Sequence, residues 1–413
     1  MSLKLVDRRL LTILFIVFVQ MVGAAMVLPI LPLFARREFD MSPAIITLLI
    51  SSFFAAQFLA GPYMGRLSDQ YGRLPVLILS QIGTAISFVM LGMSTSVEML
   101  FVARLLDGIT GGNIIVAQAY ITDVTPREKR TAALGYIFAV FGLGFIFGPA
   151  LGGVLSAAFG PRIPFLIAAA AAMLAVIITW RVLDETVTDE QKATSRSHRG
   201  SLALRQILAN TPLVIVLVVA FVGQFGLGLL QGTFALYSEA VLFAGESESA
   251  VNVGVGLLLA VIGVSQLFTQ TVLLKRLLAR FGDLWLVFAG AIIRTIGLLV
   301  FAIFTTPLFG AFASLFFAMG MGLMMPPLQS LATQAVPDAV RGGALGVYQS
   351  SVSLATIVST AIAGTIFAVN PTMPFWVGAL LSLLALLPAL LIPYQLRRQR
   401  AAISGQQSAV SGP

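Results

Sequence analysis

The sequence predicts an all-α membrane protein with twelve transmembrane helices, arranged as two six-helix bundles related by pseudo-two-fold symmetry. Of its 413 residues, 58% are hydrophobic and only 10% are charged, whereas soluble domains carry about a quarter charged residues. Apolar runs of about 20 residues, long enough to cross a bilayer core of roughly 30 Å, recur along the chain. Two loop sequences also recur at nearly the same spacing.

The first apolar run follows Arg8 and Arg9, as the core of a secretory signal would. It is too long for such a signal, contains Pro29 and Pro32, and precedes many similar runs. We therefore interpret it as a membrane span. The expected spans are residues 10–34, 44–65, 75–94, 98–121, 131–158, 162–182, 211–240, 251–274, 284–305, 308–335, 343–368 and 372–394.

One long polar segment, residues 184–206, divides the spans six from six. It mixes both charge signs with Ser and Thr and holds the only histidine, His198. Such a composition is typical of a linker. We expect an N-terminal bundle over 1–183, a cytoplasmic linker over 184–210, a C-terminal bundle over 211–396 and a disordered cytoplasmic tail over 397–413.

The distribution of the 25 Lys and Arg residues predicts the orientation. Two lie within spans (Arg104, Arg294), three lie on one side (Arg36, Arg37, Arg162), and the remaining 20 share the side of the N-terminus. Positive residues concentrate on the cytoplasmic side of membrane proteins. We expect both termini to be cytoplasmic, in the inner membrane, and no nucleic-acid partner.

Internal repeats support a duplication. The segment TPREKRTAALGY (125–136) resembles VPDAVRGGALGV (336–347) at an offset of 211, and RLSDQYGRLPVL (66–77) resembles RLLARFGDLWLV (276–287) at an offset of 210. Because an even number of spans precedes the second copy, both halves enter the membrane in the same direction, as parallel repeats do.

The loop after the second span has a distinctive spacing. Gly65 and Gly72 permit a tight turn between helices. Asp69 and Arg73 bring opposite charges to a place where they can hold neighbouring helix ends together. The alternative, an ordinary basic loop, does not explain this spacing.

The fourth span carries two charges, Arg104 and Asp107, three residues apart on one helical face near the middle of the membrane. Two interpretations stay open: a self-neutralising ion pair that orients the helix, or a group that handles protons. Arg294 also reaches mid-depth, as a structural partner or a snorkelling side chain. Glu239 is expected at the outer interface, solvated.

The fifth span contains a glycine series. Gly144, Gly148 and Gly152 form one stripe that lets another helix approach closely. Pro149 is expected to kink the helix. Simple close packing explains the glycines, but not Gly148-Pro149 followed by the glycine pair Gly152-Gly153.

Together the loop motif, Arg104 with Gly108, and the glycine series resemble the major facilitator superfamily over nearly the whole chain. The glycine series resembles the signature of its twelve-helix drug:proton antiporters, and AYITDVTP (119–126) is similar to the tetracycline-efflux branch. The resemblance implies that Asp69, Arg73 and Asp123 form a charge cluster that stabilises the outward-open state. It also implies a role in proton transfer for Arg104 and in exchange directionality for the glycine motif.

The chain departs from that pattern at three positions. Leu74 replaces a residue that is often basic, Asp107 replaces one that is often Gln, and Gln20 stands where tetracycline pumps carry an acidic residue. Tetracycline is therefore not the expected substrate, and Asp107 becomes the candidate for proton coupling.

Substrate contacts are expected from amides in the spans that line the cavity in this family, although each amide alone is better explained by a bond to another helix. A cavity with Phe and Met side chains in its walls and few polar groups suits an amphipathic or lipophilic ligand. The candidates are Gln20, Asn113, Gln231, Gln266 and Gln349.

The expected function is secondary active transport: proton-coupled export of amphipathic small molecules, as in multidrug efflux, by alternating access of a monomer in the bilayer. Protons are the coupling ion, and no other cofactor is expected. A lipid or lysolipid flippase is the alternative. An enzyme is not expected, because the sequence shows no catalytic residues and no metal-ligand spacing, and has no cysteine.

Overall fold

The computed structural model describes residues 8–111, 113–125, 130–186, 207, 210–336 and 341–391, which leaves the tail and nearly all of the linker outside the described residues. Within these ranges eleven helical segments are long and apolar enough to span a membrane. One of them, Glu248–Ile303, has 56 residues, more than twice the length that crosses a bilayer. Its backbone leaves helical geometry at Gly282. Counted as two crossings, it gives the twelve predicted spans, so the predicted fold class is confirmed.

Two helices of the first bundle begin at serine caps. The hydroxyls of Ser42 and Ser96 accept backbone N–H groups of the helices that follow them, which satisfies donors that a helix start leaves unpaired. The helices are α1 (Arg8–Phe39), α2 (Pro43–Tyr71), α3 (Arg73–Gly92), α4 (Val97–Thr110), α5 (Asn113–Val124), α6 (Arg130–Phe159) and α7 (Ile163–Val182).

The fourth crossing is two helices, whereas the sequence predicted one from 98 to 121. The helix is interrupted at Gly111, between α4 and α5. Glycine is a poor helix former, and the carbonyl freed by the break is paired: Gln57 Nε2 donates to the Gly111 oxygen over 3.2 Å. A side chain of α2 thus supports a break that the apolar pattern conceals.

The second bundle contains two short π-helical segments in addition to its α-helices. Asn210 caps its first helix by accepting the Leu213 N–H. The elements are α10 (Thr211–Tyr237), η3 (Ser238–Leu242), α11 (Glu248–Phe268), η4 (Thr269–Leu273), α12 (Leu274–Ile303), α13 (Pro307–Gln334), α14 (Arg341–Val369) and α15 (Met373–Leu384).

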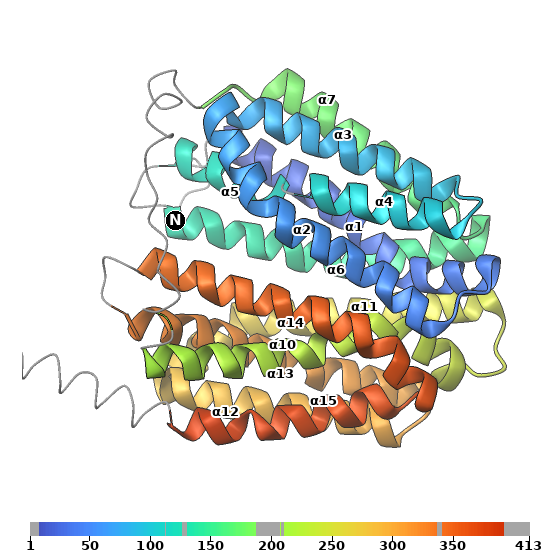
Figure 1. Ribbon diagram of the computed structural model, residues 1–413, viewed down its shortest axis with the longest axis vertical. Helices are drawn as coiled ribbons and strands as arrows, with labels where there is room; N and C mark the ends of the chain where they lie inside the picture. The colour runs from blue at the N-terminus through green and yellow to red at the C-terminus, as the bar shows by residue number, and fades with distance from the viewer. Residues whose placement is uncertain are drawn as a thin grey trace, which may run out of the picture.

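Figure 1 shows the two bundles one above the other, with their helices running in the same general direction. We call the end that carries Gly72, Gly282 and Glu185, at the start of the predicted linker, the linker end, and the end that carries Asp40 and Gly160 the far end. Gly72 has a φ of 108° and Gly282 a φ of 77°, a region that side chains disfavour. Because these glycines align at the 210-residue offset, the duplication extends to the backbone.

The bundles contact one another toward the far end. Ser51 Oγ of α2 donates to the Ile357 oxygen of α14 over 2.8 Å. In α6 and α11, Gly153 packs against the backbone of Asn252, and Gly263 packs against Ile146. Ile146 lies 13 residues before the end of α6, about 20 Å at 1.5 Å per residue. The contact therefore closes the far end to roughly the middle of a bilayer.

Candidate functional site

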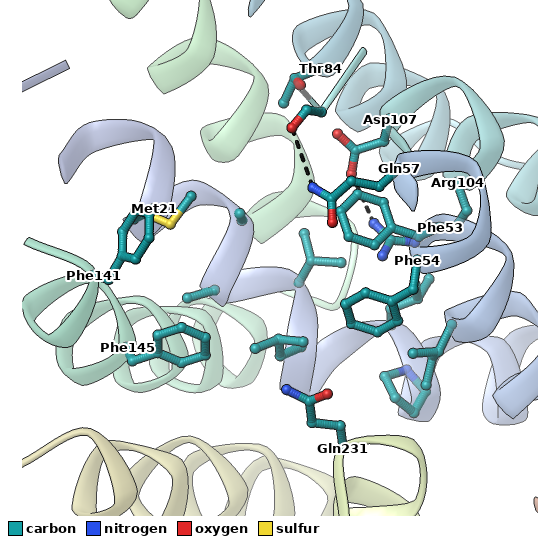
Figure 2. A pocket seen from close by; sticks show the side chains of 18 residues that line it. Met21, Phe53, Phe54, Gln57, Thr84, Arg104, Asp107, Phe141, Phe145 and Gln231 are labelled. Atoms are coloured by element: carbon teal, nitrogen blue, oxygen red, sulfur yellow. Dashed lines mark hydrogen bonds and ion pairs between the residues drawn. The ribbon is translucent and has the colours of Figure 1, made fainter. Parts of the chain in front are cut away.

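A cavity of about 260 Å³ lies between the bundles and is shown in Figure 2. Its walls come from the first bundle, with a single residue, Gln231 of α10, from the second. We call it the central pocket. The lining residues are Met21, Ala24, Ala25, Val27, Leu28, Leu31, Pro32, Ile50, Phe53, Phe54, Gln57, Thr84, Arg104, Asp107, Gly111, Phe141, Phe145 and Gln231.

The two charges of α4 face each other in the pocket wall. Arg104 Nη1 lies 2.9 Å from Asp107 Oδ2, and each side chain is only 8% exposed. The guanidinium also lies over the Phe53 ring, 4.1 Å from its centroid, and Thr84 lines the same pocket. Charges removed from water require such compensation. The structure therefore places both residues at one site, with their charges mutually neutralised.

Two amides lie on opposite walls of the pocket, one from each bundle. Gln57 comes from α2 and was missed by the sequence analysis. Among the residues that the structure describes, Gln231 Oε1 is buried without a hydrogen-bond donor. A buried carbonyl that is left unpaired is costly, so this oxygen is suited to accept a donor from a ligand or from water.

The other predicted substrate contacts are dispersed. Gln20 is buried in α1, Gln266 is half-buried in α11, and Gln349 is exposed on α14. These three residues do not line the central pocket. The side chain of Asn113 lies outside the described residues. Of the five predicted amides, Gln231 alone is placed at the pocket among the described side chains.

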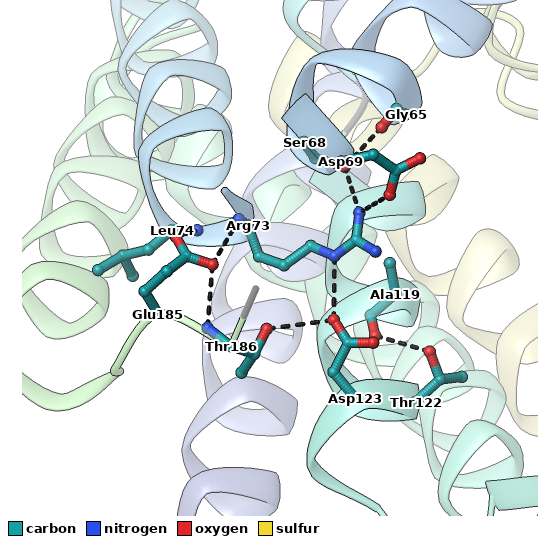
Figure 3. A network of polar contacts seen from close by, with 10 residues as sticks. All are labelled: Gly65, Ser68, Asp69, Arg73, Leu74, Ala119, Thr122, Asp123, Glu185 and Thr186. Atoms are coloured by element: carbon teal, nitrogen blue, oxygen red, sulfur yellow. Dashed lines mark hydrogen bonds and ion pairs between the residues drawn. The ribbon is translucent and has the colours of Figure 1, made fainter. Parts of the chain in front are cut away.

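At the linker end, Arg73 connects three helices (Figure 3). Its guanidinium pairs with Asp69 of α2, and its Nε lies 3.0 Å from Asp123 Oδ2 of α5. Ser68 Oγ accepts a further hydrogen bond from Nη1 over 2.8 Å. The three residues of the predicted charge cluster are thus brought together, in a structure whose far end is closed.

Glu185 joins this cluster from the start of the linker. Its carboxylate accepts the N–H groups of Arg73, over 2.9 Å, and Leu74, over 3.1 Å. It thereby caps α3, because Gly72 at the N-cap position has no side chain to do so. Thr186 donates to Asp123 over 3.1 Å. Glu185 lies 112 residues from Arg73, so no local pattern could have identified it.

The glycine stripe of α6 lies against α1. A Cβ at Gly144 would lie 2.6 Å from Met21 Cβ, and one at Gly152 would lie 2.9 Å from the Met26 oxygen. Gly148 meets α1 between them, at Ala25. Only glycine permits so close an approach.

The neighbouring motif residues face elsewhere. Gly153 packs against α11, and α6 continues as a helix through Pro149. Gly65 is less constrained, since a Cβ there would be in ordinary contact, 3.8 Å from Ile115.

Two charges outside the pocket have structural partners. Arg294 is fully buried and donates to the Gly223 oxygen and, over 2.7 Å, to Ser382 Oγ, so it is a structural residue and does not snorkel. Glu239 lies at the far end as expected, but it is ion-paired, not freely solvated: its Oε1 lies 2.8 Å from Arg37 Nε.

Comparison with known proteins agrees with this geometry. The Major Facilitator Superfamily profile matches residues 13–251 and 241–411. The chain is 30% identical to the class C tetracycline resistance protein of Escherichia coli, over 93% of this chain and 96% of the relative. It is 27% identical to multidrug resistance protein 2 of Bacillus subtilis (strain 168), over 87% and 88%.

Among solved structures, a mutant of the peptide transporter POT in complex with alafosfalin has the same fold. It superposes with a TM-score of 0.79 at 13% identity, over 96% of each chain.

Proposed function

Because this chain belongs to the Major Facilitator Superfamily and is a multi-pass membrane transporter, we propose that it exports amphipathic or lipophilic small molecules in exchange for protons. The observation that carries this proposal is the Arg104–Asp107 pair in the wall of a pocket whose other lining residues are mostly apolar or aromatic. The relatives, which are named as tetracycline and multidrug resistance proteins, support efflux as the direction.

Asp107 is the acid that would couple export of the substrate to entry of a proton. Ionised, it offers an acceptor to a donor group of a substrate; protonated, it no longer offers that charge. Proton and substrate then compete for one carboxylate, which is the requirement for exchange. Arg104 limits the energetic cost of the ionised form.

The proposed orientation places the linker end in the cytoplasm of the cell, with both termini, and the far end outside. The positive residues on the linker side support this assignment. The described structure is then closed outward, and rocking of the two bundles about the central pocket would expose it to the other side.

The decisive experiment measures proton release in proteoliposomes on addition of ethidium or chloramphenicol, with tetracycline as a compound that is not expected to be transported. We expect release with the native chain and none with Asp107→Asn, which keeps the side-chain size. Asp184→Asn is the matched control, because Asp184 forms an exposed ion pair with Arg9. Proton-coupled transport by Asp107→Asn would contradict the role of Asp107. Movement of a fluorescent lysolipid without movement of any drug would favour the flippase alternative.

A further inference from the structure

The far end holds a cluster of charges that joins the two bundles. Arg37, near the end of α1, directs Nε to Glu239 of η3 over 2.8 Å, and Nη1 to Asn252 of α11 over 3.1 Å. Asn252 Nδ2 in turn donates to Ser156 Oγ of α6 over 3.1 Å. One arginine of the first bundle thus connects to two separate elements of the second.

Glu239 is placed unusually. It lies on the π-helical segment η3, and π-helical turns make up well under 1% of residues and occur often at functional sites. Its side chain is 22% exposed. Its Oε2 is buried without a hydrogen-bond donor among the described residues, and Arg36 Nε is 4.0 Å away. The Glu239 carboxylate therefore has Arg37 as the main compensation for its charge.

The pair differs from an ordinary surface ion pair, which contributes little. The side chain of Arg37 is only 20% exposed, and its second acidic contact, Glu248 at 3.5 Å, is 78% exposed. When one partner of a largely desolvated pair is removed, the other is left uncompensated. Separation of the bundles at the far end would break the pair and leave both charges without these partners.

We propose that Arg37 and Glu239 form the outer gate of the transporter, an ion pair that closes the far end and must separate before the central pocket can open outward. This inference rests on the proposed alternating access, but it does not depend on proton coupling. It names two residues required for the cycle that lie outside the pocket and outside the charge cluster of the linker end.

The absence of cysteine from the chain allows a direct test. Ala24 is exposed in the pocket wall, so Ala24→Cys reports access to the pocket through its reaction with a membrane-impermeant maleimide. Ala244→Cys, in the exposed turn before α11, is the accessibility control. Its labelling shows that the reagent reaches the far end in the cells or vesicles used. It also controls for the amount of folded protein.

We expect slow labelling of Ala24→Cys from the far end in the native background. Glu239→Gln should raise the rate by about fivefold or more, the effect of a shift of about 1 kcal/mol in a two-state equilibrium. Arg37→Gln should raise it less, because Arg37→Gln leaves Arg36 near Glu239. Arg37→Lys, which keeps the charge, should stay close to native. Glu248→Gln is the control and should have no effect.

A double-mutant cycle tests whether the two residues act through each other. The Arg37→Gln/Glu239→Gln variant should label no faster than the faster single variant. The proposal is overturned if the two effects multiply, if Glu248→Gln matches Glu239→Gln, or if no variant changes the rate. Because labelling requires no proton gradient, failure here is distinguishable from failure of proton-coupled export.

Discussion

Arg104 Nη1 and Asp107 Oδ2 lie 2.9 Å apart in the wall of the central pocket, the guanidinium covered by the ring of Phe53. In this geometry, each charge is the main compensation for the other. Stability and transport can therefore be separated by experiment.

We expect Arg104→Gln alone to lower the free energy of unfolding by about 3–5 kcal/mol, because it strands a buried carboxylate. The Arg104→Gln/Asp107→Asn double variant should recover most of that loss, since neither charge remains. Thermal unfolding in detergent measures both. If the double variant is stable yet inactive in transport, the pair has a chemical role beyond orienting α4. A double variant as unstable as the sum of the single variants would contradict mutual neutralisation.

Glu185→Ala should weaken the start of α3. Its carboxylate caps two backbone N–H groups, and loss of such a cap costs about 1 kcal/mol. We expect a lower melting temperature and slower transport. Asp184→Asn is the control, since both side chains of the Asp184–Arg9 ion pair are exposed. Equal effects of the two substitutions would show that the cap is unimportant.

Ser382→Ala should destabilise the second bundle, because it removes an acceptor from the buried guanidinium of Arg294. The expected loss is about 1–3 kcal/mol. Ser314 is an internal control: it is fully buried, and its hydroxyl lacks a hydrogen-bond partner within the described residues. Ser314→Ala should therefore be neutral in the same thermal unfolding assay. Ser382→Ala should lower the stability of the second bundle less when Arg294→Met is also present, because the guanidinium that needs the acceptor is gone.

The amides of the pocket should contribute to substrate affinity. Gln231→Leu removes the buried, unpaired Oε1 of that side chain, and we expect the substrate concentration for half-maximal transport to rise about fivefold, as the loss of one hydrogen bond predicts. Gln57→Leu should have at least that effect, because Gln57 also holds the Gly111 carbonyl. Gln349→Leu, exposed on α14 and outside the pocket lining, should leave the value unchanged.

Gly153→Ala should favour opening at the far end. Its added methyl would meet the Asn252 carbonyl across the bundle contact, although alanine improves helix propensity by about 1 kcal/mol. Gly346→Ala has the same intrinsic gain and no atom within 4 Å of the new methyl. Faster maleimide labelling of Ala24→Cys from the far end is expected in the first variant only. Equal rates in both would mean that α6 and α11 need no close approach.

The sequence was informative where the bilayer imposes a rule. Long apolar runs give the twelve crossings, and the glycine spacing of α6 indicates a close helix contact, which the structure shows to be with α1. It was uninformative where distant residues meet. Nothing local to Gln57 or Glu185 indicates its partner, 54 and 112 residues away respectively. The break at Gly111 had a weak signal, a second glycine directly after it, but the apolar run masked it.

The division of the fourth crossing has a mechanical consequence. α4 holds Arg104 and Asp107, whereas α5 holds Asp123, which is bound to the cluster at the linker end. Two short rods on a glycine joint can change their mutual angle without breaking a hydrogen bond inside either one. A tilt of α5 therefore need not twist the buried charge pair of α4, so the two ends of this crossing can move separately.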